Sequence, residues 1–288
     1  MKIALHQITS NRASFEEDLR SYAEAGWTAF EMHVGKVDDY IVKHSVESLS
    51  RLVESSGLKP VAMSGHSVKA FSSPDEIDAN EAAFRRTLDI MEAVACPVIV
   101  FGGDGPPDIP KARDGWEESL EERDSTYRKN LSHFARQVAR LADIAEPKGV
   151  GMALEMNWCT LCRSVNTAAE VLELADRVNV GLVFDTAHFA CSASRLADLD
   201  RVQGKIIAGH LNDMRGCPPE VRDVNADRLI PGNGALPLLE WLSQVEKCGF
   251  NGWHAVEIFS EKLWEKSPLT IARNVMAGCK KLWPDAEF

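Results

Sequence analysis

The stretch ALEMNW (153–158) ends a short apolar run in a carboxylate, Glu155, and the stretch LVFDTAH (182–188) does the same with Asp185 and His188. Short apolar runs of this kind are typical of buried strands. Carboxylates and imidazoles bind metal ions and transfer protons. The repetition predicts a polar site assembled where the strands of one sheet end.

Strand-like runs rich in Val, Ile and Phe alternate with longer segments of helical period along the whole chain. The predicted strands cover residues 2–7, 29–33, 60–65, 97–102, 151–156, 181–185, 206–211 and 254–259. The predicted helices lie near residues 14–25, 43–56, 74–95, 122–146, 166–177, 194–200, 235–248 and 267–282. Alternation of this kind predicts a parallel sheet, and eight strands are the number that closes a (β/α)8 TIM barrel.

Local signals mark several helix ends. Ser14 and Glu17 have the spacing of a capping box, and Gly26 and Gly57 are expected to end helices in the left-handed conformation. Residues 102–121 form the longest irregular stretch, and their Gly and Pro content excludes a helix through the first half. Because this stretch follows the fourth strand, we expect it to form a lid over the barrel mouth.

Length and composition favour a single globular domain, residues 1–288. No apolar run approaches the roughly 20 residues needed to cross a bilayer, and the first residues are typical of a strand rather than a secretory signal. We therefore expect a cytoplasmic protein that does not associate with membranes, with its 7 cysteines reduced. The net charge of −11 disfavours nucleic acid and favours a small neutral substrate. A homo-oligomer is left open.

The strand ends carry four polar residues of matching orientation. Alternate residues of a barrel strand face the interior, and catalytic side chains come from the C-terminal strand ends. This alternation places Glu155, Asp185, His210 and Glu257 inward at one rim. Any one of them alone is better explained as a polar residue where a strand meets solvent. Four in register are not, because converging carboxylates without a cation would repel one another and lose their charge.

Three carboxylates and one imidazole make an oxygen-rich ligand set. Such a set suits Mn²⁺ first, then Mg²⁺ or Co²⁺, and is less typical of structural Zn²⁺. We expect one divalent ion per chain, with Mn²⁺ as the first choice and Mg²⁺, Co²⁺ or Zn²⁺ as alternatives.

Histidines gather at the same predicted rim. A single histidine at such a place is usually a hydrogen-bonded core or loop residue. Five on one rim indicate a polar pocket for a hydroxyl-rich ligand. The five are His6, His33, His66, His188 and His210.

The segments LEMN, FDTAH, GHLND and AVEIF, with RLIPGNGALPL (228–238) between the last two, resemble the xylose isomerase-like barrels of the sugar phosphate isomerase/epimerase superfamily. The resemblance covers nearly the whole chain. This superfamily includes ketose 3-epimerases, hydroxypyruvate isomerases, inosose dehydratases, 3-dehydroshikimate dehydratases and apurinic endonucleases. The resemblance implies a TIM barrel with a carbohydrate substrate and a divalent metal held by the four residues named above.

The resemblance also implies residues that bind substrate. His188 matches the position that contacts a substrate oxygen in the epimerases, and His66 matches a pocket histidine after the third strand. Arg215 lies close to the place of a substrate arginine in the ketose epimerases, with a different spacing from His210. Leu161 stands near the place of a second glutamate in those enzymes. These two departures weaken the case for a ketohexose substrate and leave the metal ligands unaffected.

The expected activity is metal-dependent isomerisation or epimerisation of a keto-sugar or related polyol through an enediolate. The metal polarises the carbonyl, and Glu155 or Glu257, on opposite faces of the substrate, each has an oxygen left to accept the carbon-bound proton. If His188 helps hydroxide to leave, the same site dehydrates a keto-cyclitol of the inosose or 3-dehydroshikimate type. A non-catalytic sugar-binding barrel is a further alternative. An apurinic endonuclease is disfavoured by the net charge.

Glycine-rich and cysteine-rich motifs carry less information. FGGDG (101–105) and PGNG (231–234) lack the spacing of phosphate-binding loops, so we interpret both as tight turns. Four cysteines fall in the predicted loops after the fifth, sixth and seventh strands. A thiolate zinc site that braces the rim is one hypothesis, and four separate apolar side chains are the preferred interpretation. These cysteines are Cys159, Cys162, Cys191 and Cys217.

Overall fold

Eight parallel strands close into a barrel in the order β1-β10-β7-β6-β5-β4-β3-β2. A computed structural model describes residues 1–106, 125–216 and 225–288. The barrel strands are β1 (Lys2–His6), β2 (Ala29–His33), β3 (Lys59–Val68), β4 (Val98–Gly103), β5 (Gly151–Glu155), β6 (Val180–Asp185), β7 (Ile206–Leu211) and β10 (Trp253–Val256). The predicted (β/α)8 barrel is confirmed.

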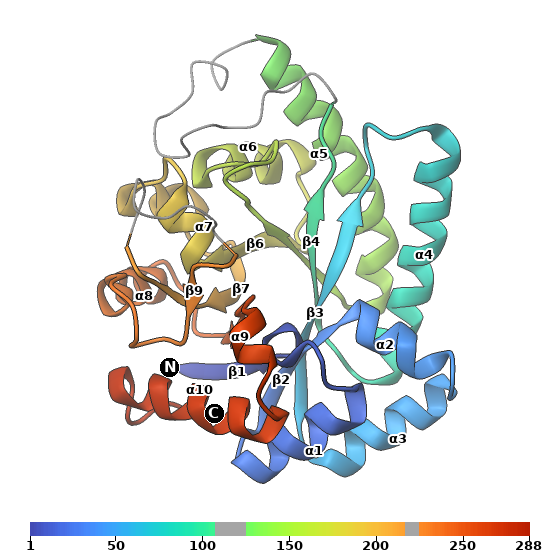
Figure 1. Cartoon of the computed structure of the whole chain (residues 1–288). Coiled ribbons are helices and arrows are strands. Elements are labelled where there is room, and N and C mark those ends of the chain that lie inside the picture. The colour runs from blue at the N-terminus through green and yellow to red at the C-terminus, as the bar shows by residue number, and fades with distance from the viewer. Residues whose placement is uncertain (107–124, 217–224) are drawn as a thin grey trace.

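Helices surround the strands (Figure 1). The α-helices are α1 (Phe15–Ala25), α2 (Val34–Ile41), α3 (Val46–Ser56), α4 (Pro74–Ala93), α5 (Ser125–Ala145), α6 (Val165–Ala175), α7 (Thr186–Cys191), α8 (Leu238–Lys247), α9 (Glu261–Trp264) and α10 (Pro268–Leu282). Short 3-10 helices cover η1 (Gln7–Ser10), η3 (Glu146–Lys148) and η4 (Leu196–Val202), and β8 (Asp213–Met214) pairs with β9 (Arg228–Leu229) outside the barrel. Within the described ranges, no helix is long and apolar enough to cross a membrane.

Side-chain caps set several helix boundaries. The Ser14 hydroxyl accepts from the Glu17 amide, and the Glu17 carboxylate accepts from the Ser14 amide, so the predicted capping box of α1 is present. Gly26 ends that helix at φ 92°, a left-handed conformation that glycine adopts without strain. Ser45 caps α3 at the Ser48 amide, which is why this helix starts later than predicted.

The segment after β6 differs from the prediction. Residues 194–200 were predicted to be α-helical, whereas the chain forms the 3-10 helix η4 there. A short α-helix, α7, instead begins directly after β6. Asp185 is its N-cap, and Asp185 Oδ1 accepts from the His188 amide at 2.9 Å. Because the Asp185 carboxylate caps α7 at the His188 amide, the backbone of His188 is held close to the end of β6.

The barrel interior is filled by small apolar side chains. Ala153, Val183 and Ala208 belong to one buried cluster that is separate from the main hydrophobic core. Their neighbours Met152 and Leu154 belong to that main core, which includes helix residues. The alternation predicted for β5 is therefore correct. Residues two further along these strands are Glu155, Asp185 and His210, which places all three at the barrel mouth.

The last barrel strand ends earlier than predicted. β10 stops at Val256, so Glu257 is the first residue after it. The hydroxyl of Thr9 donates to the Val256 carbonyl at 2.8 Å and accepts from the Ile258 amide at 3.0 Å. A side chain thus replaces strand pairing at this point. The Glu257 amide still donates to the Leu211 carbonyl at 3.1 Å, which keeps Glu257 beside β7.

Candidate metal centre

Four polar side chains meet at the C-terminal end of the barrel. Glu155, Asp185, His210 and Glu257 each offer one potential ligand atom, and these atoms all lie within 4.8 Å of one another. Strand register explains the convergence: Glu155 pairs with Val183 on β6, and Asp185 pairs with His210 on β7. The structure thus brings together the four residues that the sequence predicted as ligands.

The donor set fits a divalent cation. Asp185 Oδ2 is buried and accepts no hydrogen bond from the described residues, although Arg228 Nη1 lies 3.2 Å away as an ion pair. A buried carboxylate oxygen without a hydrogen bond is costly unless a cation satisfies it. Three carboxylates and an imidazole also supply the ligand types that such ions take.

His210 is fully buried between carboxylates. Its Nδ1 lies 2.7 Å from Glu155 Oε1 and its Nε2 lies 3.1 Å from Glu31 Oε1. Burial by itself would lower the pKa of His210, but Glu31, Glu257 and Glu155 raise that pKa well above its ordinary value. These carboxylates favour the protonated imidazole, so a metal ion at Nδ1 competes with a proton.

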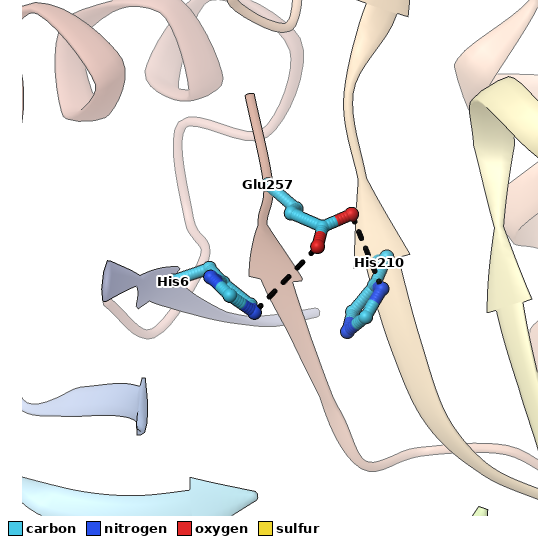
Figure 2. Close-up of side chains that lie close together, drawn as sticks. All are labelled: His6, His210 and Glu257. Atoms are coloured by element: carbon cyan, nitrogen blue, oxygen red, sulfur yellow. Dashed lines mark ion pairs between the residues drawn. The ribbon is translucent and has the colours of Figure 1, made fainter. Parts of the chain in front are cut away.

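His6 adds a second imidazole next to Glu257 (Figure 2). His6 Nε2 lies 3.6 Å from Glu257 Oε1, and His210 Nδ1 lies 3.4 Å from Glu257 Oε2, so the two oxygens of one carboxylate face two histidines. His6, His210 and Glu257 also form a second group of potential ligands. All three are buried.

Arg228 is part of the site, and the sequence prediction missed it. Its guanidinium donates to Glu257 through Nη1, and Nη2 lies 3.2 Å from His188 Nε2. Burial would lower the pKa of Arg228, but Asp185, Glu257 and Glu155 raise it. The side chain is a permanent cation within the carboxylate cluster. It also lies over the Phe259 ring, 5.2 Å from the ring centroid.

Arg228 is positioned by the PGNG turn, which the structure confirms as a turn. Asp213 Oδ2 accepts from the amides of Gly232 at 3.0 Å and Gly234 at 2.9 Å. A Cβ on Gly234 would overlap the Asp213 carboxylate, so glycine is required there. Met214 pairs with Arg228 in the β8-β9 hairpin, which connects this turn to the guanidinium.

The substrate residues predicted from the resemblance lie in different surroundings. His188 is buried against Arg228, and its Nδ1 has no hydrogen-bond partner among the described residues. His66 lies in β3 with its ring 5.0 Å from that of Phe84, and burial lowers its pKa to about 4. The side chain of Arg215 is 74% exposed and pairs with Asp227 at 3.8 Å. The structure therefore does not bring Arg215 to the cluster.

Two further expectations depend on residues outside the described ranges. The predicted lid, residues 102–121, is described only as far as residue 106. Cys217 also lies outside these ranges. Among the described residues, no group of three or more potential metal ligands includes Cys159, Cys162 or Cys191. The thiolate zinc site and the lid stay predictions.

The chain is a TIM barrel with a cluster of potential metal ligands at the C-terminal ends of its strands, and comparison with known families identifies the family. The xylose isomerase-like TIM barrel family matches residues 19–282, so the chain belongs to this family. It is 28% identical over 279 residues to an inosose isomerase of Bacillus velezensis, which covers 92% of this chain and 91% of that protein. An inosose dehydratase of Mesomycoplasma hyopneumoniae is 22% identical over 93% of this chain and 89% of its own length.

Solved structures share the fold. The crystal structure of the IolI protein with a bound zinc atom superimposes with a TM-score of 0.82 and 23% sequence identity, and the match covers 100% of this chain and 99% of that chain. At this identity the similarity shows the barrel alone.

Proposed function

We propose that this chain is a divalent-metal-dependent isomerase of a keto-cyclitol, such as an inosose, that acts through an enediolate. The observation that carries the proposal is the convergence of Glu155, Asp185, His210 and Glu257 within 4.8 Å at the barrel mouth. The relatives named inosose isomerase support the substrate class, because their similarity extends over 92% of the chain.

The four converging residues would hold the metal. Bound there, the ion would polarise the substrate carbonyl and stabilise the negative charge of the enediolate. Three carboxylates favour Mn²⁺, whereas the zinc in the IolI structure supports Zn²⁺ as the alternative.

Glu155 and Glu257 are the proposed proton-transfer residues. A carboxylate removes the proton from the carbon beside the ketone, and the electron pair of that C–H bond forms the enediolate double bond. The hydroxyl proton moves to the former ketone oxygen, and return of the carbon-bound proton to the former carbonyl carbon shifts the ketone by one position. The Glu155 side chain is 22% exposed and that of Glu257 is 8% exposed, which favours Glu155 for the first proton.

Arg228 and His188 would orient the substrate. The guanidinium keeps Glu257 and Asp185 ionised by its charge, which is the protonation state that a ligand or a base requires. His188 Nδ1 is buried and has no hydrogen-bond partner among the described residues, and we propose that it binds a substrate hydroxyl in the complex. The same nitrogen supports dehydration as the second candidate, because it could deliver a proton to departing hydroxide.

Proton exchange tests these proposals. We would load the protein with Mn²⁺ or Zn²⁺ and incubate it in D₂O with inososes, keto-hexoses and 3-dehydroshikimate, following deuterium incorporation by NMR. We expect deuterium in an inosose together with a positional isomer of it. An unsaturated product would support the dehydratase. Metal and ligand binding without any exchange would contradict both activities and indicate a sugar-binding barrel.

A further inference from the structure

Glu31, on the opposite side of His210 from the candidate ligands, is a fully buried carboxylate that the ligand group does not include. We infer that Glu31 is a positioning residue that holds His210 in the tautomer with Nδ1 free for a metal ion. This inference rests on the metal site of the proposed function and adds the residue that orients its only imidazole.

The two nitrogens of His210 face different partners. Nδ1 lies 2.7 Å from Glu155 Oε1, 3.4 Å from Glu257 Oε2 and 3.8 Å from Asp185 Oδ2. Nε2 lies 3.1 Å from Glu31 Oε1. Nδ1 is therefore the atom that points at the other three ligands. Nε2 points away from them.

The carboxylate of Glu31 requires hydrogen-bond donors as its partners. An ionised carboxylate accepts hydrogen bonds and donates none, so Nε2 of His210 must carry a hydrogen to satisfy it. Glu31 is 1% exposed, which leaves it without bulk water as a substitute. A hydrogen fixed on Nε2 leaves Nδ1 as the nitrogen whose lone pair can bind the ion. Metal-binding histidines commonly donate their other N–H to a carboxylate in this way.

His6 lies beside Glu31, and its Nε2–H already has a hydrogen-bond partner. Its Nδ1 accepts from the Ile8 amide at 2.9 Å, so the hydrogen of a neutral His6 is on Nε2. Nε2 lies 2.6 Å from the Ser64 hydroxyl, which in turn donates to the Met32 carbonyl. Glu31 Oε1 lies 3.4 Å from the same Nε2. His6 is thus better explained as part of the hydrogen-bonded support than as a ligand of a second ion.

The test compares two substitutions at one site with a matched control. Glu31→Leu removes the acceptor, and Glu31→Gln keeps a weaker, uncharged one. Asp18→Asn is the control, because Asp18 is an equally buried carboxylate whose side-chain partners are Gln7, Ser10 and Lys36. We would measure Zn²⁺ affinity by chelator competition, and ¹¹³Cd–¹⁵N coupling in protein labelled at the histidine nitrogens.

We expect Glu31→Leu to bind Zn²⁺ about 10–100-fold more weakly than the wild type, Glu31→Gln to lie between, and Asp18→Asn to match the wild type. In the wild type, cadmium should couple to Nδ1 of His210 while Nε2 keeps its hydrogen. Coupling through Nε2, or unchanged Zn²⁺ affinity in Glu31→Leu, would overturn the inference alone. A wild-type protein that binds neither ion would overturn the proposed metal site and this inference together. Coupling in the wild type decides the tautomer even if Glu31→Leu fails to fold.

Discussion

Arg228 Nη2 lies 3.2 Å from His188 Nε2, while Nη1 of the same guanidinium pairs with Glu257 and Asp185. One buried cation therefore connects two candidate ligands to a candidate substrate-binding histidine. In the metal-free protein, this cation compensates part of the charge that a metal ion would neutralise.

Arg228→Met should destabilise the metal-free protein. Removal of one partner from a buried ion pair typically costs about 3–5 kcal/mol, because the remaining charges are left uncompensated. Bound metal should restore part of this loss by supplying positive charge at the same carboxylates. Arg215→Met is the matched control, since its side chain is 74% exposed, and we expect a change within about 0.5 kcal/mol. Denaturant unfolding with and without Zn²⁺ measures the loss of stability and its recovery on metal binding. Equal changes in unfolding free energy for the two substitutions would show that the charge of Arg228 does not stabilise the carboxylate cluster.

Asp185→Asn should release the metal and keep the fold. Asp185 Oδ1 caps α7 at the His188 amide, so the single oxygen of an asparagine is expected to stay at that cap. The amide nitrogen would then replace Oδ2, the oxygen that faces His210 Nδ1 and Arg228 Nη1, and an amide N–H₂ does not coordinate metal. Elemental analysis should find about one ion per wild-type chain and little in the variant. Full metal occupancy in Asp185→Asn would contradict the site. Asp185→Ala, which lacks the cap as well, should also lose the metal and be less stable.

The predictions from sequence succeeded where strand alternation decides the answer. Glu155, Asp185 and His210 lie two residues beyond the interior side chains Ala153, Val183 and Ala208, so alternation alone placed them at the mouth. The same rule also points Glu31 inward from β2, although Glu31 is not among the four predicted ligands. The predicted positions of the strand ends were less accurate. β10 ends at Val256, where the Thr9 hydroxyl binds the backbone, and no local sequence pattern predicts a contact between residues so far apart in the chain.

Arg228 could not be found by periodicity. It lies in a two-residue strand outside the barrel, and its direction depends on the turn that Asp213 holds. The resemblance instead drew attention to Arg215, which is nearer to His210 in the sequence. Proximity along the chain is a poor guide in a loop, because a hairpin can return a later residue to the site while an earlier one stays in solvent.

Low pH should reduce the free energy of unfolding through His254, which lies at the end of the barrel opposite the candidate metal centre. Burial lowers the pKa of His254 to about 3, whereas an unfolded histidine has a pKa of about 6.5. As the pH falls, the unfolded chain binds this proton first, so the stability contribution is full above about pH 6.5 and is lost toward pH 3. Each such group contributes a slope of about 1.4 kcal/mol per pH unit in that window. His254→Leu should reduce the slope of unfolding free energy against pH by this amount. Replacement of the exposed His44 by Leu is the control, and an unchanged slope in His254→Leu would refute the assignment.

Glu257→Gln and Glu155→Gln separate proton transfer from metal binding. Each glutamine keeps an oxygen that can bind the ion but loses the basic oxygen, so turnover should fall further than metal affinity. A positioned general base contributes about 10²–10⁴-fold to the rate, which sets the effect expected on kcat. The two variants should also differ from each other, because Glu155 is the more exposed carboxylate and Glu257 is paired with Arg228.

Deuterium exchange on a confirmed substrate distinguishes their roles. If Glu155 removes the first proton, Glu155→Gln should lose exchange, whereas Glu257→Gln should retain exchange and lose a later step. In an epimerase each variant should exchange deuterium into one epimer and not the other, since each lacks the base of one face. Metal content measured on the same samples is the control. If both variants hold their metal and turn over substrate at nearly the wild-type rate, neither glutamate is a base, and the two serve only as ligands.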